Sequence, residues 1–61
     1  MSGTAENITK AMHDSGFLID SLQTALKTAS ATESIIILQL VEQATKLAQQ
    51  ISNLDMAINC D

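Results

Sequence analysis

The sequence predicts an all-α protein, an antiparallel two-helix hairpin that dimerises into a four-helix bundle. Apolar residues recur along most of the chain at alternating spacings of three and four, the pattern of amphipathic helices. There is no proline and there are two glycines, so signals for turns and sheets are scarce. With 61 residues the chain holds one domain, and so short a chain buries only about 60% of the surface it exposes when unfolded. Because one hairpin covers one side of each apolar stripe, we expect two copies to pair.

A first amphipathic helix is predicted over residues 5–29. Its stripe is apolar except at one serine and consists of Ala5, Ile8, Met12, Ser15, Ile19, Leu22, Leu26 and Ala29. Further apolar residues widen the stripe on one flank, namely Ala11, Leu18 and Ala25. Thr4 is placed to cap the start, and Glu6 suits the positive end of the helix dipole. Glu6 and Lys10 lie four residues apart, so we expect them to form an ion pair.

Gly16 lies in the middle of this helix. A glycine there costs about 1 kcal/mol relative to alanine. Close approach of a neighbouring helix or a partner would explain it, and a tolerated defect is the alternative.

A second helix is predicted over about residues 32–59. Its stripe contains no polar residue and consists of Ile37, Leu40, Ala44, Leu47, Ile51, Leu54 and Ile58. Val41 and Ala48 widen this stripe on one flank and Ile36 on the other. Glu42 and Lys46 have the spacing of a second ion pair on the outside of the helix.

The two stripes are out of phase, which predicts a turn at about residues 29–32. A continuous helix would bring Glu33, Gln43 and Gln50 into the first stripe. Ser30 followed by Glu33 is a capping box, the sequence signal of a helix start. Since no glycine or proline enforces the turn, a continuous coiled coil with a stutter is the alternative.

The expected core of the oligomer comes from both stripes. Its residues are Ile8, Met12, Ile19, Leu22, Leu26, Ile37, Leu40, Ala44, Leu47, Ile51, Leu54 and Ile58. This pattern suits bundles of several orders, so a higher oligomer is as compatible with it as a dimer.

Composition argues against several classes of function. The net charge is -4, with three dispersed lysines and no arginine, whereas nucleic-acid and anionic-membrane binders carry clustered basic residues. His13, the single histidine, has no ligand residue at helical spacing, and neither paired carboxylates nor a glycine-rich phosphate loop occurs. We therefore expect no catalysis, no metal and no cofactor.

The chain is expected to be cytoplasmic. The first residues lack the basic start and apolar run of a signal peptide, and the longest apolar run, 35–38, is far too short to span a membrane. The single cysteine, Cys60, excludes a disulfide framework within the chain and is interpreted as a free thiol near the C-terminus.

A few apolar residues lie away from the stripes and are the candidates for contact with a partner. Phe17, the single aromatic residue, falls on the polar face of the first helix with His13. Ile35 and Leu38 also lie away from the stripe, and with their neighbours they make the start of the second helix apolar nearly all round. Because aromatic side chains are enriched in binding hot spots, we expect a small regulatory, adaptor or inhibitor protein that binds another protein through these residues. Coverage of these residues inside a larger oligomer, or incidental exposure of Phe17, is the alternative. Small helical proteins of this type are common among bacterial and phage accessory factors.

Two alternatives come from other classes of function. In length and expected architecture the chain is similar to the Rop family of plasmid copy-number proteins, and this resemblance of topology implies an RNA-binding hairpin dimer. The basic and aromatic RNA-facing residues of such a protein have no counterpart here. The second alternative is a self-assembling bundle that holds a small ligand between its subunits.

Overall fold

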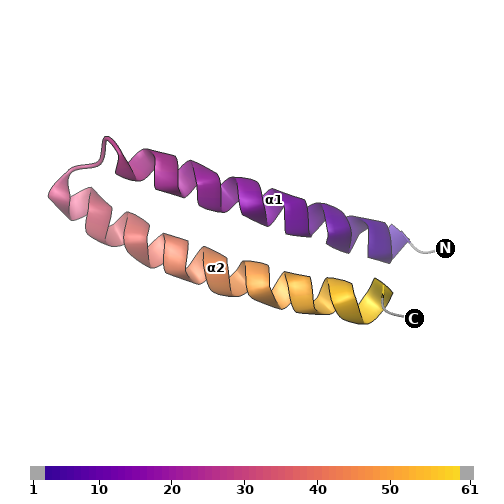
Figure 1. Ribbon diagram of the computed structural model, residues 1–61. Coiled ribbons are helices and arrows are strands. Elements are labelled where there is room, and N and C mark those ends of the chain that lie inside the picture. The colour runs from indigo at the N-terminus through magenta and orange to yellow at the C-terminus, as the bar shows by residue number, and fades with distance from the viewer. Residues whose placement is uncertain (1–2, 60–61) are drawn as a thin grey trace.

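The computed structural model describes residues 3–59, which form a hairpin of two long helices, α1 (Gly3–Leu26) and α2 (Ala31–Asn59). The helices lie side by side and antiparallel along their whole length, with the turn at one end of the molecule (Figure 1). The hairpin is a narrow rod with extents of 47 × 14 × 12 Å. The predicted all-helical hairpin is confirmed for these residues, and the pairing of two hairpins stays a prediction. Neither helix within residues 3–59 has the length and hydropathy needed to cross a bilayer.

The turn forms without any left-handed residue. Helix α1 ends at Leu26, three residues earlier than predicted, and the backbone N–H groups of residues 27–29 each donate to a carbonyl three residues back, at 3.1–3.4 Å. These tighter bonds satisfy carbonyls that the end of an α-helix would leave without a partner. No residue between 3 and 59 has a positive φ, which explains how the chain turns with neither glycine nor proline.

The predicted capping box at the start of α2 is confirmed. The backbone N–H of Ser30 donates to the Glu33 carboxylate at 2.9 Å, and the backbone N–H of Glu33 donates to the Ser30 hydroxyl at 3.2 Å. The two residues thus satisfy each other's amide groups at the helix start, where no intrahelical carbonyl is available. Helix α2 begins at Ala31, directly after this cap.

Small residues lie at the centre of the contact between the helices. Among residues 3–59 only Ser15 and Ala44 are buried, each with 7% of its surface exposed. The Ser15 hydroxyl donates to the Met12 carbonyl oxygen of its own helix at 2.7 Å, so the one polar residue of the first stripe is satisfied locally. Small side chains let the helix axes approach, but they bury little apolar surface.

Helix α2 presents a different flank of its stripe to α1 than the centre of the predicted stripe. The α2 residues that are buried or half-buried against α1 include Ile37, Val41, Ala44, Ala48, Ile51 and Asp55. Leu40, Leu47 and Leu54, which belong to the predicted stripe, remain exposed on the hairpin. The contact therefore uses the flank that carries Val41 and Ala48 and leaves a row of leucines uncovered.

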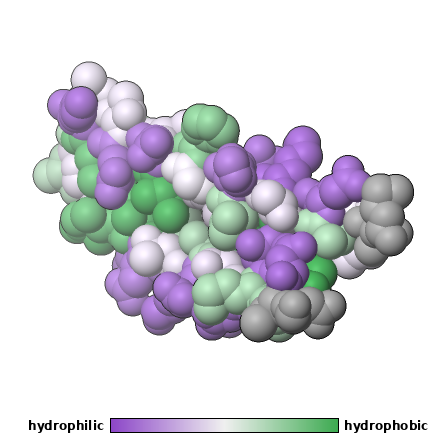
Figure 2. Space-filling model, turned by 45° about the vertical axis from the view of Figure 1, so that its right-hand side comes forward, coloured by the Kyte–Doolittle hydropathy of each residue, from purple (hydrophilic) through white to green (hydrophobic). Residues whose placement is uncertain are grey.

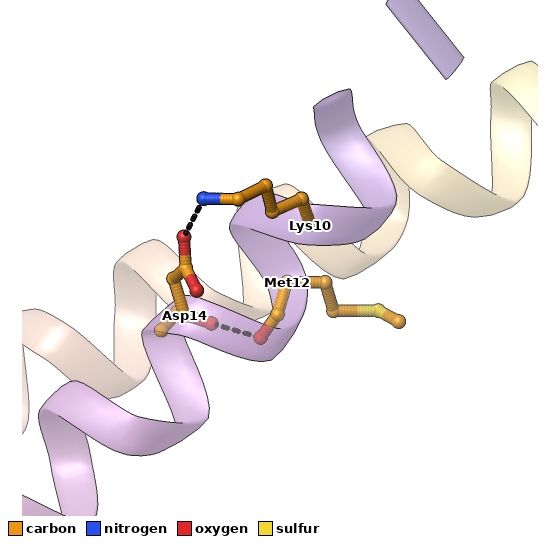
Figure 3. A network of polar contacts seen from close by, with 4 residues as sticks. Lys10, Met12 and Asp14 are labelled. Carbon is orange, nitrogen blue, oxygen red and sulfur yellow. Dashed lines mark hydrogen bonds and ion pairs between the residues drawn. The ribbon is translucent and has the colours of Figure 1, made fainter. Parts of the chain in front are cut away.

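The surface ion pairs are each formed between residues one helical turn apart. Lys46 pairs with Glu42 at 3.6 Å, as predicted. Lys10 pairs with Asp14 at 3.1 Å, so the prediction that it pairs with Glu6 was wrong (Figure 3). Both carboxylates lie four residues from Lys10, and the ammonium group is turned towards the one on its C-terminal side.

Candidate interaction surfaces

An apolar groove runs between the two helices on one side of the hairpin. Its more enclosed part is an open hollow of about 260 Å³ lined by Leu18, Leu22, Leu40, Gln43, Ala44 and Leu47. A second hollow, of about 400 Å³, lies towards the turn and is lined by Ala25, Thr28, Ala29, Glu33, Ile36 and Ile37. We call this surface the groove face.

The walls of the groove face are leucines that the single hairpin leaves partly in water. Leu18, Leu40 and Leu47 are 46%, 42% and 49% exposed. Leu40, Leu47 and Leu54 follow one another at intervals of seven residues and so form one row along α2. An exposed row of this kind is a surface that a further helix can cover.

The sequence pattern predicts these leucines but not the groove. It places Leu40, Leu47 and Leu54 at the centre of the α2 stripe and Leu18 on a flank of the α1 stripe, whereas in the structure all four are exposed and three of them line the groove. The shared spacing of seven residues was the available signal, since Leu18 and Ala25 repeat on α1 as Leu40 and Leu47 do on α2. No feature of the pattern indicates Gln43, the polar group in the more enclosed hollow.

The predicted partner residues on α1 lie outside the groove. Phe17 is the most exposed large apolar residue of the hairpin, with 69% of its surface accessible, and His13, one turn earlier, is also exposed. Asp14 lies on the same side of α1, where it is held by Lys10. Phe17 is therefore a hydrophobic side chain within a polar, charged surface.

Ile35 and Leu38 form a separate site near the turn. Both are more than half exposed, and they lie in the first two turns of α2. The hydrogen bond between Thr9 and Asp55 sets the level of one helix against the other. From that level Phe17 lies about 12 Å towards the turn and Leu38 about 25 Å, at a rise of about 1.5 Å per residue. The structure thus does not bring Phe17 together with Ile35 and Leu38. On the face seen in Figure 2, hydrophobic residues gather towards the end of the hairpin that bears the turn.

The described part of the chain offers no ready site for a metal ion. No group of three His, Cys, Asp or Glu side chains between residues 3 and 59 is arranged to hold one. Cys60, interpreted above as a free thiol, lies outside the described residues.

Comparison with known proteins gives no relative from which a function could be transferred. No protein-family model, no curated protein and no solved structure matches the chain.

Proposed function

We propose that this protein is a small, non-enzymatic regulatory, adaptor or inhibitor protein that binds another protein through the α1 surface around Phe17. The observation that carries this proposal is the exposure of Phe17, the single aromatic residue, on the outside of the hairpin. Transfer of such a side chain from water into an interface is favourable by roughly 1.5–3 kcal/mol. Aromatic anchors of this kind dominate many protein interfaces.

The residues around Phe17 have the chemistry of an interface rim. His13 and Asp14 lie one turn before Phe17 on the same side of α1, and Lys10 holds the Asp14 carboxylate at 3.1 Å. Protein interfaces commonly place an apolar centre inside a polar rim that stays hydrated. In this proposal Phe17 enters a pocket of the partner while His13 and the ion pair contact its edge.

Ile35 and Leu38 provide a second contact point. Leu38 is two residues from both Ile36 and Leu40, so it lies about 200° round the helix from the groove face. Leu38 therefore stays accessible when the groove is covered. A partner that reached both points would follow the hairpin from the middle of α1 to the turn.

Pairing of hairpins into a four-helix bundle is part of the same proposal. With only Ser15 and Ala44 buried among residues 3–59, one hairpin has almost no core of its own. Chains of this length are marginal as monomers, and burial of apolar surface against a second copy would stabilise them. The working form in the cytoplasm is thus a homodimer or higher oligomer whose outer helix faces bind the partner.

The alternative functions have less support from the structure. Two of the three lysines, Lys10 and Lys46, are engaged with carboxylates of their own helices, which reduces their availability for RNA phosphates. The hollow beside Leu18 and Leu47 is open and lined almost wholly by aliphatic side chains, so it offers a small ligand little beyond the Gln43 amide for specific recognition.

The test is the binding of source-cell proteins to immobilised wild-type protein, to Phe17→Ala and to Thr24→Ala. Thr24 is the matched control because it is exposed on the same side of α1, seven residues after Phe17. We expect the wild type and Thr24→Ala to retain the same cellular protein. When its binding is measured again with purified components, its affinity for Phe17→Ala should be at least about tenfold lower than for the wild type. Equal affinity for Phe17→Ala and wild type would contradict the proposal.

A further inference from the structure

We infer that the groove face is the surface through which two copies of this chain pair, with the Leu40, Leu47 and Leu54 row of one copy seated in the hollows of the other. The inference rests on the proposed pairing of hairpins and adds which face is used and which side chains interlock. It also implies that the Phe17 surface stays free in the assembled protein.

The groove and the leucine row are complementary in spacing. The more enclosed hollow is bordered by Leu18, and the hollow nearer the turn by Ala25, seven residues further along α1. Seven residues of helix span about 10 Å, which is also the interval between Leu40 and Leu47. A second copy therefore carries large side chains at the separation of the two hollows, as knobs-into-holes packing requires.

The size of the face fits a stable dimer. A rod of 47 Å by 14 Å presents an outline of about 650 Å² on one side. Two such faces give about 1,300 Å², within the range of roughly 1,200–2,000 Å² that stable interfaces bury. The hairpin thus offers enough area for a second copy without any other surface.

The charges of the chain do not oppose this pairing. Each copy carries a net charge of -4, so two copies repel each other unless their charged groups are kept apart. Of the residues that line the two hollows, only Glu33 is charged, and it is held in the capping box at the turn. The ion-paired Lys46 and Glu42 do not line either hollow.

The opposite side of the hairpin is less suited to self-pairing. Thr45 and Ser52 lie on the side of α2 that faces away from the leucine row. Thr45 is about 200° round the helix from Leu47. Its hydroxyl donates to the Val41 carbonyl oxygen at 2.7 Å and is exposed. Covering that side would remove polar groups from water, whereas covering the groove face removes leucines.

The first experiment measures molar mass by light scattering for the wild type, Leu47→Lys and Leu38→Lys over a range of protein concentrations. Leu38 is the matched control because it is a similarly exposed leucine of α2 outside the groove. We expect the wild-type mass to correspond to at least two chains of 6.5 kDa. The dissociation constant of self-association should rise at least about 100-fold in Leu47→Lys and less than about threefold in Leu38→Lys. A monomeric wild type, or an unchanged dissociation constant in Leu47→Lys, would overturn the inference.

A second measurement on the unmodified chain covers the case in which Leu47→Lys does not fold. Hydroxyl-radical footprinting of the wild type, at concentrations above and below association, should protect Leu18, Leu40 and Leu47 in the associated state. Oxidation of Phe17 and Met56, both more than 60% exposed and outside the two hollows, should not change. Protection of Phe17 and Met56 in place of the leucines would overturn the inference. Loss of partner binding in Phe17→Ala would support the proposed function independently of this result.

Discussion

Thr9 and Asp55 join the two helices by a hydrogen bond between residues 46 positions apart in the chain. The Thr9 hydroxyl donates to Oδ1 of Asp55 at 2.8 Å, at the end of the hairpin opposite the turn. The same carboxylate oxygen accepts from the Asn59 side-chain amide at 2.9 Å. Thr9 and Asp55 are both half-buried, so their hydrogen bond is a polar link within an otherwise mainly apolar contact. Polar pairs at such positions specify the register in which helices pack.

Removal of the Thr9 hydroxyl is expected to destabilise the hairpin. Thr9→Val should lower the free energy of unfolding by about 1–2 kcal/mol, because the half-buried Asp55 carboxylate loses a donor. A double-mutant cycle with Asp55→Ala should show a coupling of about 1 kcal/mol in chemical denaturation at one fixed protein concentration. The control is Thr45→Val, since the Thr45 hydroxyl bonds only within its own helix and its loss should cost less. Equal effects of Thr9→Val and Thr45→Val would show that the link between the helices contributes nothing.

Ser30 is expected to contribute more to stability than its exposed position suggests. Ser30→Ala removes the oxygen that accepts the Glu33 backbone N–H and should cost about 1 kcal/mol in the same denaturation experiment. Ser30→Asp should retain most of that stability, because aspartate also caps a helix start. Thr32→Ala, an exposed change two residues later, serves as the control and should stay within about 0.5 kcal/mol of the wild type. If Ser30→Ala were as stable as Thr32→Ala, the capping box would be incidental.

Gly16→Ala is expected to stabilise the protein. A Cβ built at Gly16 meets nothing within 4 Å, so α2 does not need this glycine for close approach. Alanine should therefore raise the free energy of unfolding by up to about 1 kcal/mol, the difference in helix propensity. The comparison is Gly3→Ala at the first residue of α1, where the gain should be smaller because the helix end frays. A loss of stability in Gly16→Ala would instead show that another helix covers this position in the assembly.

Ser15 is expected to be replaceable by a residue of similar size but not by a larger one. Its hydroxyl bonds to the Met12 carbonyl oxygen of its own helix, so Ser15→Ala breaks no link to α2 and should stabilise by about 0.5 kcal/mol through helix propensity. Ser15→Leu would restore the apolar stripe in sequence but overfill the most closely packed part of the contact, and should cost about 1–3 kcal/mol. Thermal unfolding of both variants checks this, and a more stable Ser15→Leu would mean that the helices are not held close at this level.

Most of the fold could be predicted from local patterns, and the groove could not. Spacings of three and four, together with the Ser30 and Glu33 pair, indicate two helices and where the second begins. Helix α1 ends three residues earlier than the pattern predicts, because hydrogen bonds between residues three apart terminate it and no residue type marks them. Phe17 could be identified as exposed, since its position on the polar face follows from helix geometry alone. Its separation from Ile35 and Leu38 required the structure.

The sequence by itself determined that the chain forms two amphipathic helices with a break at the Ser30 cap, because helix periodicity and capping are local properties. Only the tertiary structure decided which edge of the α2 stripe faces α1. That stripe is wide enough to pack through Leu40 and Leu47 or through Val41 and Ala48, and periodicity does not distinguish the two. Packing through the smaller residues lets Ser15 and Ala44 become buried and brings Asp55 to Thr9, which leaves the leucine row on the groove face.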